Sequence, residues 1–196
     1  MNYIVLASGN KDKLKELRLL AGIGSIVAIG DIIPDWDVEE TGLTLEENAL
    51  LKARAAAEAT GRTAIADDTG LFVWALGDAP GVYTARYAGE SCSYYDNTVK
   101  LLNALSGERN SNRRASFRTV IALVTPDGEE HVFKGSVDGL ITEAHSGEEG
   151  FGYDPVFFSL ELEKTFAECS TEEKNTVSHR ARAMRELNEY LEHDGV

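Results

Sequence analysis

The sequence predicts an α/β protein in which helices flank a mixed β-sheet. Over the first half of the chain, short apolar runs typical of strands alternate with segments whose apolar residues recur at helical spacing. The second half holds two long strand-like runs, 115–125 and 129–139, separated by a Pro-Asp-Gly turn. This hairpin argues against a purely parallel, doubly wound sheet. A chain of 196 residues is long enough for one domain with a substantial core.

The individual elements of the first half follow from periodicity and from capping signals. Leucines at helical spacing mark the first helix. Thr44 and Glu47 form a capping-box pattern ahead of an alanine-rich helix, which stops at Gly61. In chain order we expect a strand over 2–8, a helix over 11–21, a strand over 25–30, a loop over 31–42, a helix over 45–60, and strands over 63–67 and 71–76.

The second half begins with a Pro-Gly turn at 80–81 and a helix over 93–107 that ends in glycine. The hairpin follows. A glycine-rich loop over 146–155 then leads into the apolar run 156–158, and a helix over 178–193 opens at Ser178. In α/β proteins, ligands bind where strands end and loops begin. We therefore expect the function to lie in the loops that follow the strands.

The composition favours a small anionic ligand over a nucleic-acid polymer. The net charge is −14, with 43% hydrophobic and 27% charged residues. A polymer binder needs a broad basic surface, whereas a nucleotide needs only a local group of donors, often with a divalent metal. There is no apolar run of 18 residues and no signal-peptide pattern, so we expect a cytoplasmic protein without a membrane span. Cys92 and Cys169 lie in no metal-binding spacing, and we expect two reduced thiols.

The segment SGNKDK, residues 8–13, has the features of a phosphate site. Gly9 lets an anion approach the backbone, and Lys13 adds a positive charge one turn into the helix that follows. The helix N-terminus adds N–H donors and the positive end of its dipole. The segment is not a P-loop, however, and Ser8 or Asn10 ahead of a helix is more often an N-cap.

Two acidic segments are candidates for metal binding. The segment DVEETG, residues 37–42, has three acids close to a glycine. In the segment AIADDTGL, residues 64–71, an apolar strand is followed by Asp67 and Asp68. Mg²⁺ favours one or two carboxylates completed by water and substrate phosphates, and such a carboxylate can accept a proton from water. Side chains alternate along an extended chain, so the two aspartates should face different environments. The alternatives are a solvated acidic loop and a plain DDTG turn.

Two segments of the C-terminal half offer groups for a flat ring. Phe151 and Tyr153 in FGYDP can stack on a base, and Asp154 can accept from a ring N–H. In EEKNTVSHR, residues 172–180, the groups that can donate to ring or phosphate oxygens are Lys174, His179 and Arg180. The alternatives are an aromatic turn and an N-capped helix, although two cations in its first turn oppose the helix dipole. Together the four segments fit a nucleoside triphosphate with Mg²⁺.

Six blocks cover nearly the whole chain in order: LASGNKDKLKEL, EETGLTLEENALLKA, AIADDTGL, PGVYTARYAG, GFGYDPVFF and EEKNTVSHRARAM. In these blocks the sequence resembles the RdgB-like, inosine triphosphate pyrophosphatase family. The family usually has Thr where this chain has Ser8, so the hydroxyl is kept. The resemblance implies an elongated mixed α/β fold. Residues 1–196 would form a single ITPase-like domain with two lobes around a central cleft, and the protein would be a homodimer.

The resemblance also implies an activity, the Mg²⁺-dependent hydrolysis of ITP, dITP and XTP to the nucleoside monophosphate and pyrophosphate. Glu39 and Asp68 would bind Mg²⁺, and Asp68 would also be the general base. Arg86 in TARY is a further candidate for the site. The phosphates would contact Ser8, Gly9, Asn10, Lys13 and Lys52, the substrate would also contact Thr69, and the nucleobase pocket would contain Phe151, Gly152, Tyr153, Asp154, Lys174, His179 and Arg180.

Two other functions compete with this one. A Maf-like pyrophosphatase would act on other nucleotides, and the SHR and FGYDP motifs argue against it. A non-catalytic nucleotide sensor would not need the intact Lys13, Glu39 and Asp68. The alternation of side chains along the strand further predicts that Asp68→Asn loses far more activity than Asp67→Asn.

Overall fold

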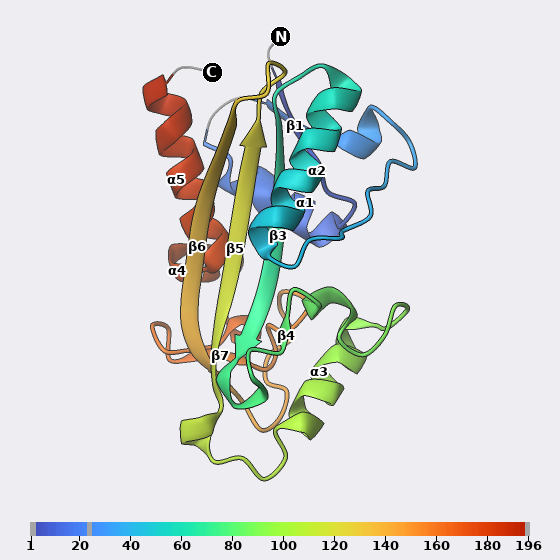
Figure 1. The fold of residues 1–196 in the computed structure, drawn as a ribbon. Helices are drawn as coiled ribbons and strands as arrows, with labels where there is room; N and C mark the ends of the chain where they lie inside the picture. The colour runs from blue at the N-terminus through green and yellow to red at the C-terminus, as the bar shows by residue number, and fades with distance from the viewer. Residues whose placement is uncertain (1–2, 23–24, 195–196) are drawn as a thin grey trace. The chain divides into compact units, whose positions relative to one another are not determined.

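A computed structural model describes residues 3–22 and 25–194, and Figure 1 shows its helices and strands. In chain order these are β1 (Tyr3–Leu6), α1 (Lys11–Leu20), β2 (Ser25–Ala28), α2 (Leu45–Thr60), β3 (Ala64–Val73), β4 (Pro80–Gly81), α3 (Tyr94–Ala104), β5 (Arg114–Val124), β6 (Glu130–Ile141), β7 (Phe157–Ser159), β8 (Lys164–Thr165), α4 (Thr171–Val177) and α5 (His179–Asp194). The predicted α/β class is confirmed. Within the described ranges, no helix has both the length and the apolar character needed to cross a membrane.

The described strands form a mixed eight-stranded sheet. Its order is β2-β1-β3-β5-β6-β7-β8, with β4 paired to β3. Strand β1 pairs in parallel with both β2 and β3, whereas β7 pairs antiparallel with both β6 and β8. The neighbouring strands β5 and β6 are consecutive in the chain, as the predicted hairpin requires. The prediction of a mixed sheet with flanking helices is therefore confirmed.

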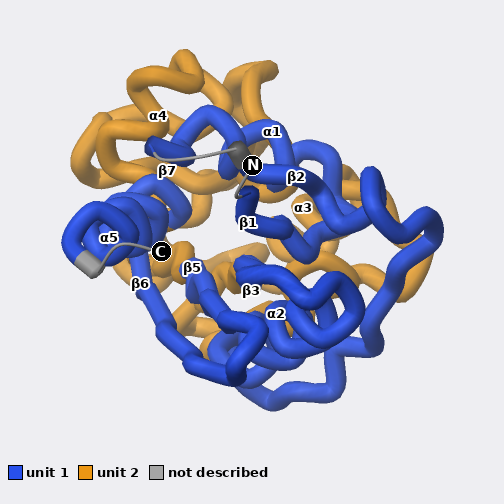
Figure 2. Tube along the Cα trace, turned by 90° about the horizontal axis from the view of Figure 1, so that it is seen from above, with its two compact units in different colours: residues 1–68, 119–135, 180–196 blue, residues 69–118, 136–179 orange. Residues whose placement is uncertain are grey.

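The chain divides into two compact units, which Figure 2 shows in different colours. Unit 1 comprises residues 1–68, 119–135 and 180–196, and unit 2 comprises residues 69–118 and 136–179. Each unit has a buried apolar cluster of its own. The single domain with a central cleft stays a prediction.

In unit 1, helices α1 and α5 pack on the same face of the strands. Leu17 of α1 and Met184 of α5 join Ile65 of β3 and Ile121 of β5 in one buried cluster. Helix α2 lies on the other side of these strands in Figure 2. Burial of such apolar side chains stabilises the unit by roughly 25 cal/mol per Å² of apolar surface removed from water.

Helix α2 has the boundaries that its sequence predicts. Thr44 and Glu47 form the capping box, and Gly61 ends the helix with φ 62°, a conformation that favours glycine. The side chains that it buries are mostly alanines, which let the helix approach the strands closely. Two polar residues, Asn48 and Lys52, are buried on the same helix, four positions apart. Both therefore need polar partners within the folded chain.

Strand β3 is longer than the sequence predicts, because residues 64–73 form one continuous strand. The interpretation of DDTG as a turn is therefore wrong. Gly70 has a different role, since a Cβ at this position would lie 2.7 Å from the carbonyl oxygen of Gly81 on the neighbouring β4. The glycine allows two strands to approach closely, and Asp67 and Asp68 lie within an extended segment rather than at its end.

Two helix boundaries also differ from the prediction. The helix predicted over 93–107 is α3, which ends at Ala104. Ser178 immediately precedes the C-terminal helix, as predicted, but it follows a helix rather than a loop. It ends the additional helix α4, where its N–H donates to the carbonyl oxygen of Lys174 over 2.9 Å, and α5 begins at the next residue.

Candidate active site

The segment between β1 and α1 is an N-cap with an open backbone. The side-chain oxygen of Asn10 accepts from the backbone N–H groups of Asp12 and Lys13, at 3.0 and 3.1 Å. The Ser8 hydroxyl accepts from the N–H of Asn10 at 3.3 Å. Gly9 is exposed, and no atom lies within 4 Å of the place that a Cβ would occupy. The N-cap interpretation is thus confirmed, and the open backbone at Gly9 leaves room for a phosphate.

Asp67 faces helices α1 and α5 and binds a cation from each. Its Oδ2 lies 3.1 Å from Nζ of Lys13 and 3.6 Å from Nε of Arg180. Burial raises the pKa of the Asp67 carboxyl, but the charges of Lys13, Arg180 and Lys52 lower it by more. The pKa therefore lies well below its ordinary value of 3.8, and the group is an anion at neutral pH.

Asp68 faces helix α2 and has different partners. Its Oδ1 accepts from Nζ of Lys52 and its Oδ2 from Nδ2 of Asn48, both over 3.4 Å. Burial has the largest effect on the Asp68 carboxyl and raises its pKa above the ordinary 3.8, although Lys52 and Lys13 oppose the change. The prediction that the two aspartates face different environments is confirmed, and of the two Asp68 is the stronger base.

Lys52 joins three groups on the α2 side of the strand. Its Nζ donates to Oε1 of Glu40 over 2.6 Å and to the backbone oxygen of Asp67 over 2.8 Å, besides its contact with Asp68. Burial lowers the pKa of Lys52, but the charges of Asp68, Asp67 and Glu40 raise it by more. Lys52 is therefore a firmly charged cation beside the candidate base.

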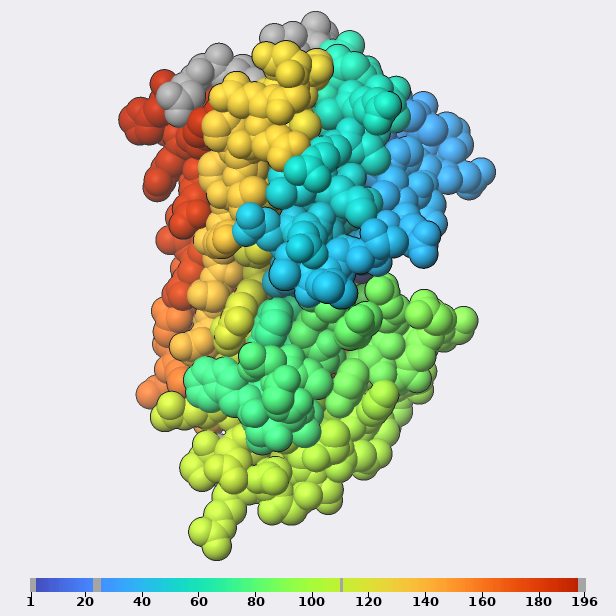
Figure 3. Space-filling view, in the orientation of Figure 1, coloured from blue at the N-terminus to red at the C-terminus, as the bar shows by residue number. Residues whose placement is uncertain are grey.

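The acidic loop 37–42 is anchored to this group through its last residue. The N–H of Gly42 donates to Oδ1 of Asn48 over 2.8 Å, and the same Asn48 side chain donates to Asp68. The segment around the loop lies at the surface in Figure 3. Glu40 reaches Lys52, whereas Glu39, the predicted metal ligand, is exposed. The loop therefore brings one acid to the buried lysine and leaves the other at the surface.

The donor set on the α2 side fits a hard divalent cation that is completed by other ligands. Among the described residues, no three acidic, histidine or cysteine side chains are grouped closely enough to hold a metal by themselves. Mg²⁺ does not require such a group, because it retains waters and shares substrate phosphates. Each oxygen of Asp68 accepts one hydrogen bond, and a carboxylate has about four acceptor positions. Asp68 therefore has the capacity to bind a metal while it keeps both protein contacts.

In unit 2, the predicted base-binding segments form one cluster. Oδ2 of Asp154 accepts from the N–H of Phe151 over 2.9 Å and from Nζ of Lys174 over 2.6 Å. Lys174 Nζ lies 5.2 Å from the ring centroid of Phe151, whose ring also contacts Tyr94 at a centroid distance of 5.8 Å. The predicted residues Phe151, Asp154 and Lys174 are thus brought together around a half-buried aromatic ring.

Two other predicted base-pocket residues lie in the core of unit 2. The ring of His179 stacks on Phe117 with a centroid distance of 4.6 Å and an interplanar angle of 13°. Tyr153 is buried, and its hydroxyl donates to the backbone oxygen of Thr84 over 2.9 Å. Both side chains are buried whereas Phe151 is half-buried, so Phe151 is the better stacking platform.

The remaining predicted residues are placed as follows. Thr69 is half-buried in β3, and Gly152 has φ 65° in the loop before β7. Arg86 lies near the exposed Glu90, at 3.7 Å, and above the ring of Tyr83. Arg180 belongs to unit 1 and forms an ion pair with Glu16 as well as with Asp67.

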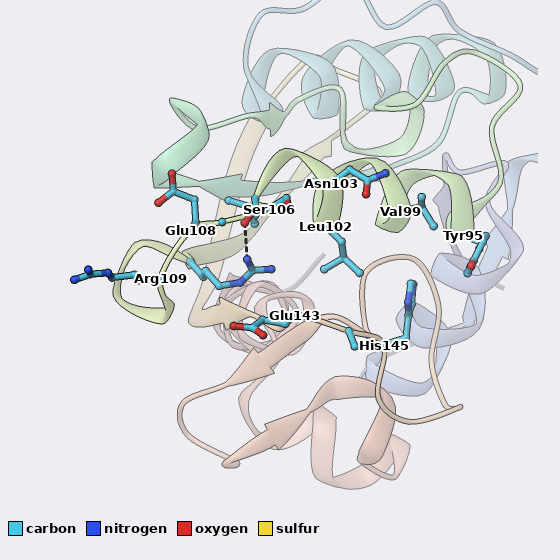
Figure 4. A pocket seen from close by; sticks show the side chains of 13 residues that line it. Tyr95, Val99, Leu102, Asn103, Ser106, Glu108, Arg109, Glu143 and His145 are labelled. Atoms are coloured by element: carbon cyan, nitrogen blue, oxygen red, sulfur yellow. Dashed lines mark hydrogen bonds between the residues drawn. The ribbon is translucent and has the colours of Figure 1, made fainter.

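A separate pocket of about 790 Å³ lies in unit 2, between α3 and residues 143–145 (Figure 4). None of the predicted site residues lines it. Its buried cation, Arg113, donates to the backbone oxygens of Leu105, Ile141 and Thr142 over 2.6–2.8 Å. The guanidinium thus holds backbone segments together. The predicted residues lie elsewhere, in one group around Asp68 in unit 1 and in another around Phe151 in unit 2.

Sequence reasoning missed three partners of the predicted residues: Glu16 beside Arg180, Glu40 beside Lys52, and Asn48 beside Asp68. Asn48 had a detectable signal, because it is a polar residue four positions before Lys52 on an otherwise alanine-rich helix face. Glu16 had none, because its partner Arg180 is 164 positions away in the sequence. Only the folded chain brings these two charges together.

Comparison with known proteins places this geometry in a family. The model of the Ham1 family matches residues 4–190. A dITP/XTP pyrophosphatase from Staphylococcus aureus is 48% identical over 194 residues, which cover 99% of this chain and 98% of that protein. The structure of the Staphylococcus aureus Ham1 protein is similar, with a TM-score of 0.89 at 48% identity, covering 98% of this chain and 100% of that one. A HAM1 protein from Coxiella burnetii has a TM-score of 0.88 at 41% identity, with coverage of 98% and 99%. The chain therefore belongs to the Ham1 family.

Proposed function

We propose that this protein hydrolyses non-canonical purine nucleoside triphosphates, namely dITP, XTP and ITP, to the nucleoside monophosphate and pyrophosphate. The observation that carries the proposal is the match, at 48% identity over 99% of the chain, to a dITP/XTP pyrophosphatase. The buried Asp68 between Lys52 and Asn48 supplies a base of the kind that this hydrolysis needs. The protein is thus an enzyme of the hydrolase class that acts on acid anhydrides.

In this proposal, residues of unit 1 bind the phosphates of the substrate. Ser8, Gly9, Asn10 and Lys13 offer an open backbone and a cation to the phosphate oxygens. Asp68 accepts a proton from the attacking water as the water oxygen bonds to the α-phosphorus. The bond from the α-phosphorus to the bridging oxygen breaks, and pyrophosphate leaves. The raised pKa of Asp68 favours this proton transfer over that to an ordinary carboxylate.

We also propose that the reaction depends on Mg²⁺, held by Asp68 together with Glu39. When bound, the metal neutralises phosphate charge and acidifies a bound water. The acceptor capacity of Asp68 supports this assignment, as does the exposure of Glu39 at the surface. Lys52 neutralises part of the acidic charge near Asp68 and keeps the carboxylate oriented.

In this proposal, residues of unit 2 bind the nucleobase of the substrate. Phe151 supplies a ring for stacking, and Lys174 supplies a donor beside it. Hypoxanthine and xanthine present an oxygen acceptor at the six-position, where adenine presents an amino group. A protein donor that faces the six-position has no acceptor when adenine is bound. The free energy of binding is then less favourable by about 1–3 kcal/mol per buried group. This difference favours six-oxo purines over adenine.

We further propose that the protein is cytoplasmic and homodimeric, and that its two units are lobes of one ITPase-like domain. The two free cysteines, Cys92 and Cys169, support a reducing compartment. The six sequence blocks support the dimer. Light scattering coupled to gel filtration tests it, because a dimer has twice the chain mass of 21.4 kDa.

A substrate panel with product identification tests the proposed function. The protein is incubated with Mg²⁺ and ITP, XTP, dTTP or UTP, and the products are separated by ion-exchange chromatography. We expect IMP and pyrophosphate from ITP, and no turnover after removal of the metal with EDTA. Preference for dTTP or UTP would favour the Maf-like alternative. Orthophosphate with IDP, or tight binding without turnover in wild type and Asp68→Asn alike, would overturn the proposal.

A further inference from the structure

Four side chains of alternating charge form a chain of ion pairs in unit 1. Lys13 and Glu16 lie on helix α1, three positions apart, so they occupy the same face of the helix. Asp67 of β3 contacts Lys13 and Arg180, and Arg180 in turn contacts Glu16. The network therefore ties two helices to the strand that carries Asp68.

Access to solvent differs along this network. The Asp67 side chain is 1% exposed and that of Arg180 is 3% exposed, whereas the Lys13 side chain is 18% exposed. Of the two cations, Lys13 is thus the one that an anionic ligand can reach. Asp67 has its charge compensated by two cations, so it is poorly suited to bind a metal.

We propose that Asp67 is a positioning residue, which holds the ammonium group of Lys13 where the phosphates of the substrate bind, without contacting the substrate itself. The inference rests on the proposed function, because the phosphate role of Lys13 is part of it. A long lysine side chain has many rotamers, and an anchored one loses less freedom when the phosphate arrives. Asp67 acts on the cation, whereas Asp68 on the opposite face acts on water.

The expected effect is a loss of substrate affinity without a loss of the chemical step. Asp67→Asn keeps the shape of the side chain and removes its charge, so Lys13 loses its anchor. We expect KM for dITP to rise by about 10- to 100-fold, the range of a lost charge-assisted hydrogen bond, with a smaller change in kcat. Asp68→Asn should instead lower kcat, with a smaller change in KM.

A double-mutant cycle separates positioning from general structural support. The variants are Asp67→Asn, Lys13→Met and the double variant, each assayed for kcat/KM on dITP. If Asp67 acts through Lys13, the double variant retains the kcat/KM of Lys13→Met within about two-fold, because nothing remains to be positioned. Losses that multiply in the double variant would overturn the proposal.

Two further variants and one binding assay provide the controls. Asp31→Asn removes an exposed acid that pairs with Arg18 of the same helix α1, and it should leave kcat/KM unchanged. Glu16→Gln breaks the far end of the network and should lower the unfolding midpoint with little effect on KM. A KM effect of Glu16→Gln as large as that of Asp67→Asn would contradict positioning and favour a merely structural role.

Binding of inorganic triphosphate, measured by calorimetry, distinguishes a failure of this inference from a failure of the proposed function. If wild type does not hydrolyse dITP, the proposed function fails, but the effect of Asp67→Asn on triphosphate affinity still tests the anchoring of Lys13. Equal affinity of wild type and Asp67→Asn for triphosphate would refute the anchoring directly.

Discussion

Gly42→Ala is expected to disturb the acidic loop and the candidate base together. Gly42 donates its N–H to Asn48, and Asn48 donates to Asp68, so a single backbone position controls both contacts. A Cβ at Gly42 would lie 2.5 Å from Oδ1 of Asn48 and 2.7 Å from Cβ of Glu47. Both distances are shorter than any normal contact, so the loop or the Asn48 side chain must move.

The magnitude follows from two costs. Overpacking of this kind costs about 1–3 kcal/mol. Displacement of the loop also breaks the 2.8 Å hydrogen bond from Gly42 and removes this donor from the buried Oδ1 of Asn48, at about 1–3 kcal/mol. A total of about 3 kcal/mol would lower the unfolding midpoint by roughly 6–12 °C in a chain of this length.

The assay is thermal unfolding followed by circular dichroism, combined with initial rates of dITP hydrolysis. Gly30→Ala is the matched control, because no atom lies within 4 Å of the corresponding Cβ position at Gly30. It should unfold at the wild-type temperature or slightly above it. In an Asn48→Ala background, Gly42→Ala should cost less, because the closest contact is then absent.

The reasoning is refuted if Gly42→Ala unfolds within about 2 °C of Gly30→Ala and retains wild-type activity. That outcome would mean that the loop does not need its close approach to Asn48. Loss of activity at an unchanged midpoint would support the link to Asp68 and would contradict the estimate of overpacking.

Three further predictions concern the charged residues. Asp68→Asn should lower kcat for dITP by about 10²- to 10⁴-fold, far more than Asp67→Asn does, and equal losses in steady-state kinetics would contradict the separation of roles. Lys174→Met leaves the buried Asp154 without its cation, so urea unfolding should show a loss of about 3–5 kcal/mol, whereas the control Lys164→Met, in a solvent-exposed ion pair, should lose much less. Since the cations around Asp67 hold the pKa of its carboxyl below 3.8, the stability that this group contributes is present above pH 3.8 and is lost as the pH falls further. Asp67→Asn should therefore lose less stability than wild type between pH 4 and pH 2, and parallel acid-unfolding curves would contradict this assignment.

The sequence predicted the features that depend on local chemistry. The capping box at Thr44, the glycine stop at Gly61 and the long hairpin are all encoded within a few neighbouring positions. The different environments of Asp67 and Asp68 also followed from strand periodicity alone. Such features are predictable because they need no knowledge of distant segments.

The features that the sequence did not predict depend on contacts between distant segments of the chain. DDTG has the composition of a turn, but pairing of Leu71 with Gly81 keeps it extended, and tertiary pairing overrides local preference. The contact of His179 with Phe117 and the place of Tyr153 in the core of unit 2 were not predicted, because the packing partners are distant in the sequence. The partner of each charged group was likewise beyond the reach of sequence spacing.

The continuous strand β3 makes the two aspartates unequal in their tolerance of a register shift. Sliding the strand by one residue toward its C-terminal end would place Asp67 where Asp68 stands and Ala66 where Asp67 stands. Lys52 would still face a carboxylate, but Lys13 and Arg180 would face a methyl group. An insertion ahead of Asp67 in this strand would thus spare the acid beside helix α2 and remove the one between helices α1 and α5, whereas a deletion there would do the reverse. Engineered length changes are therefore better placed in the surface loops, where no such exchange of faces follows.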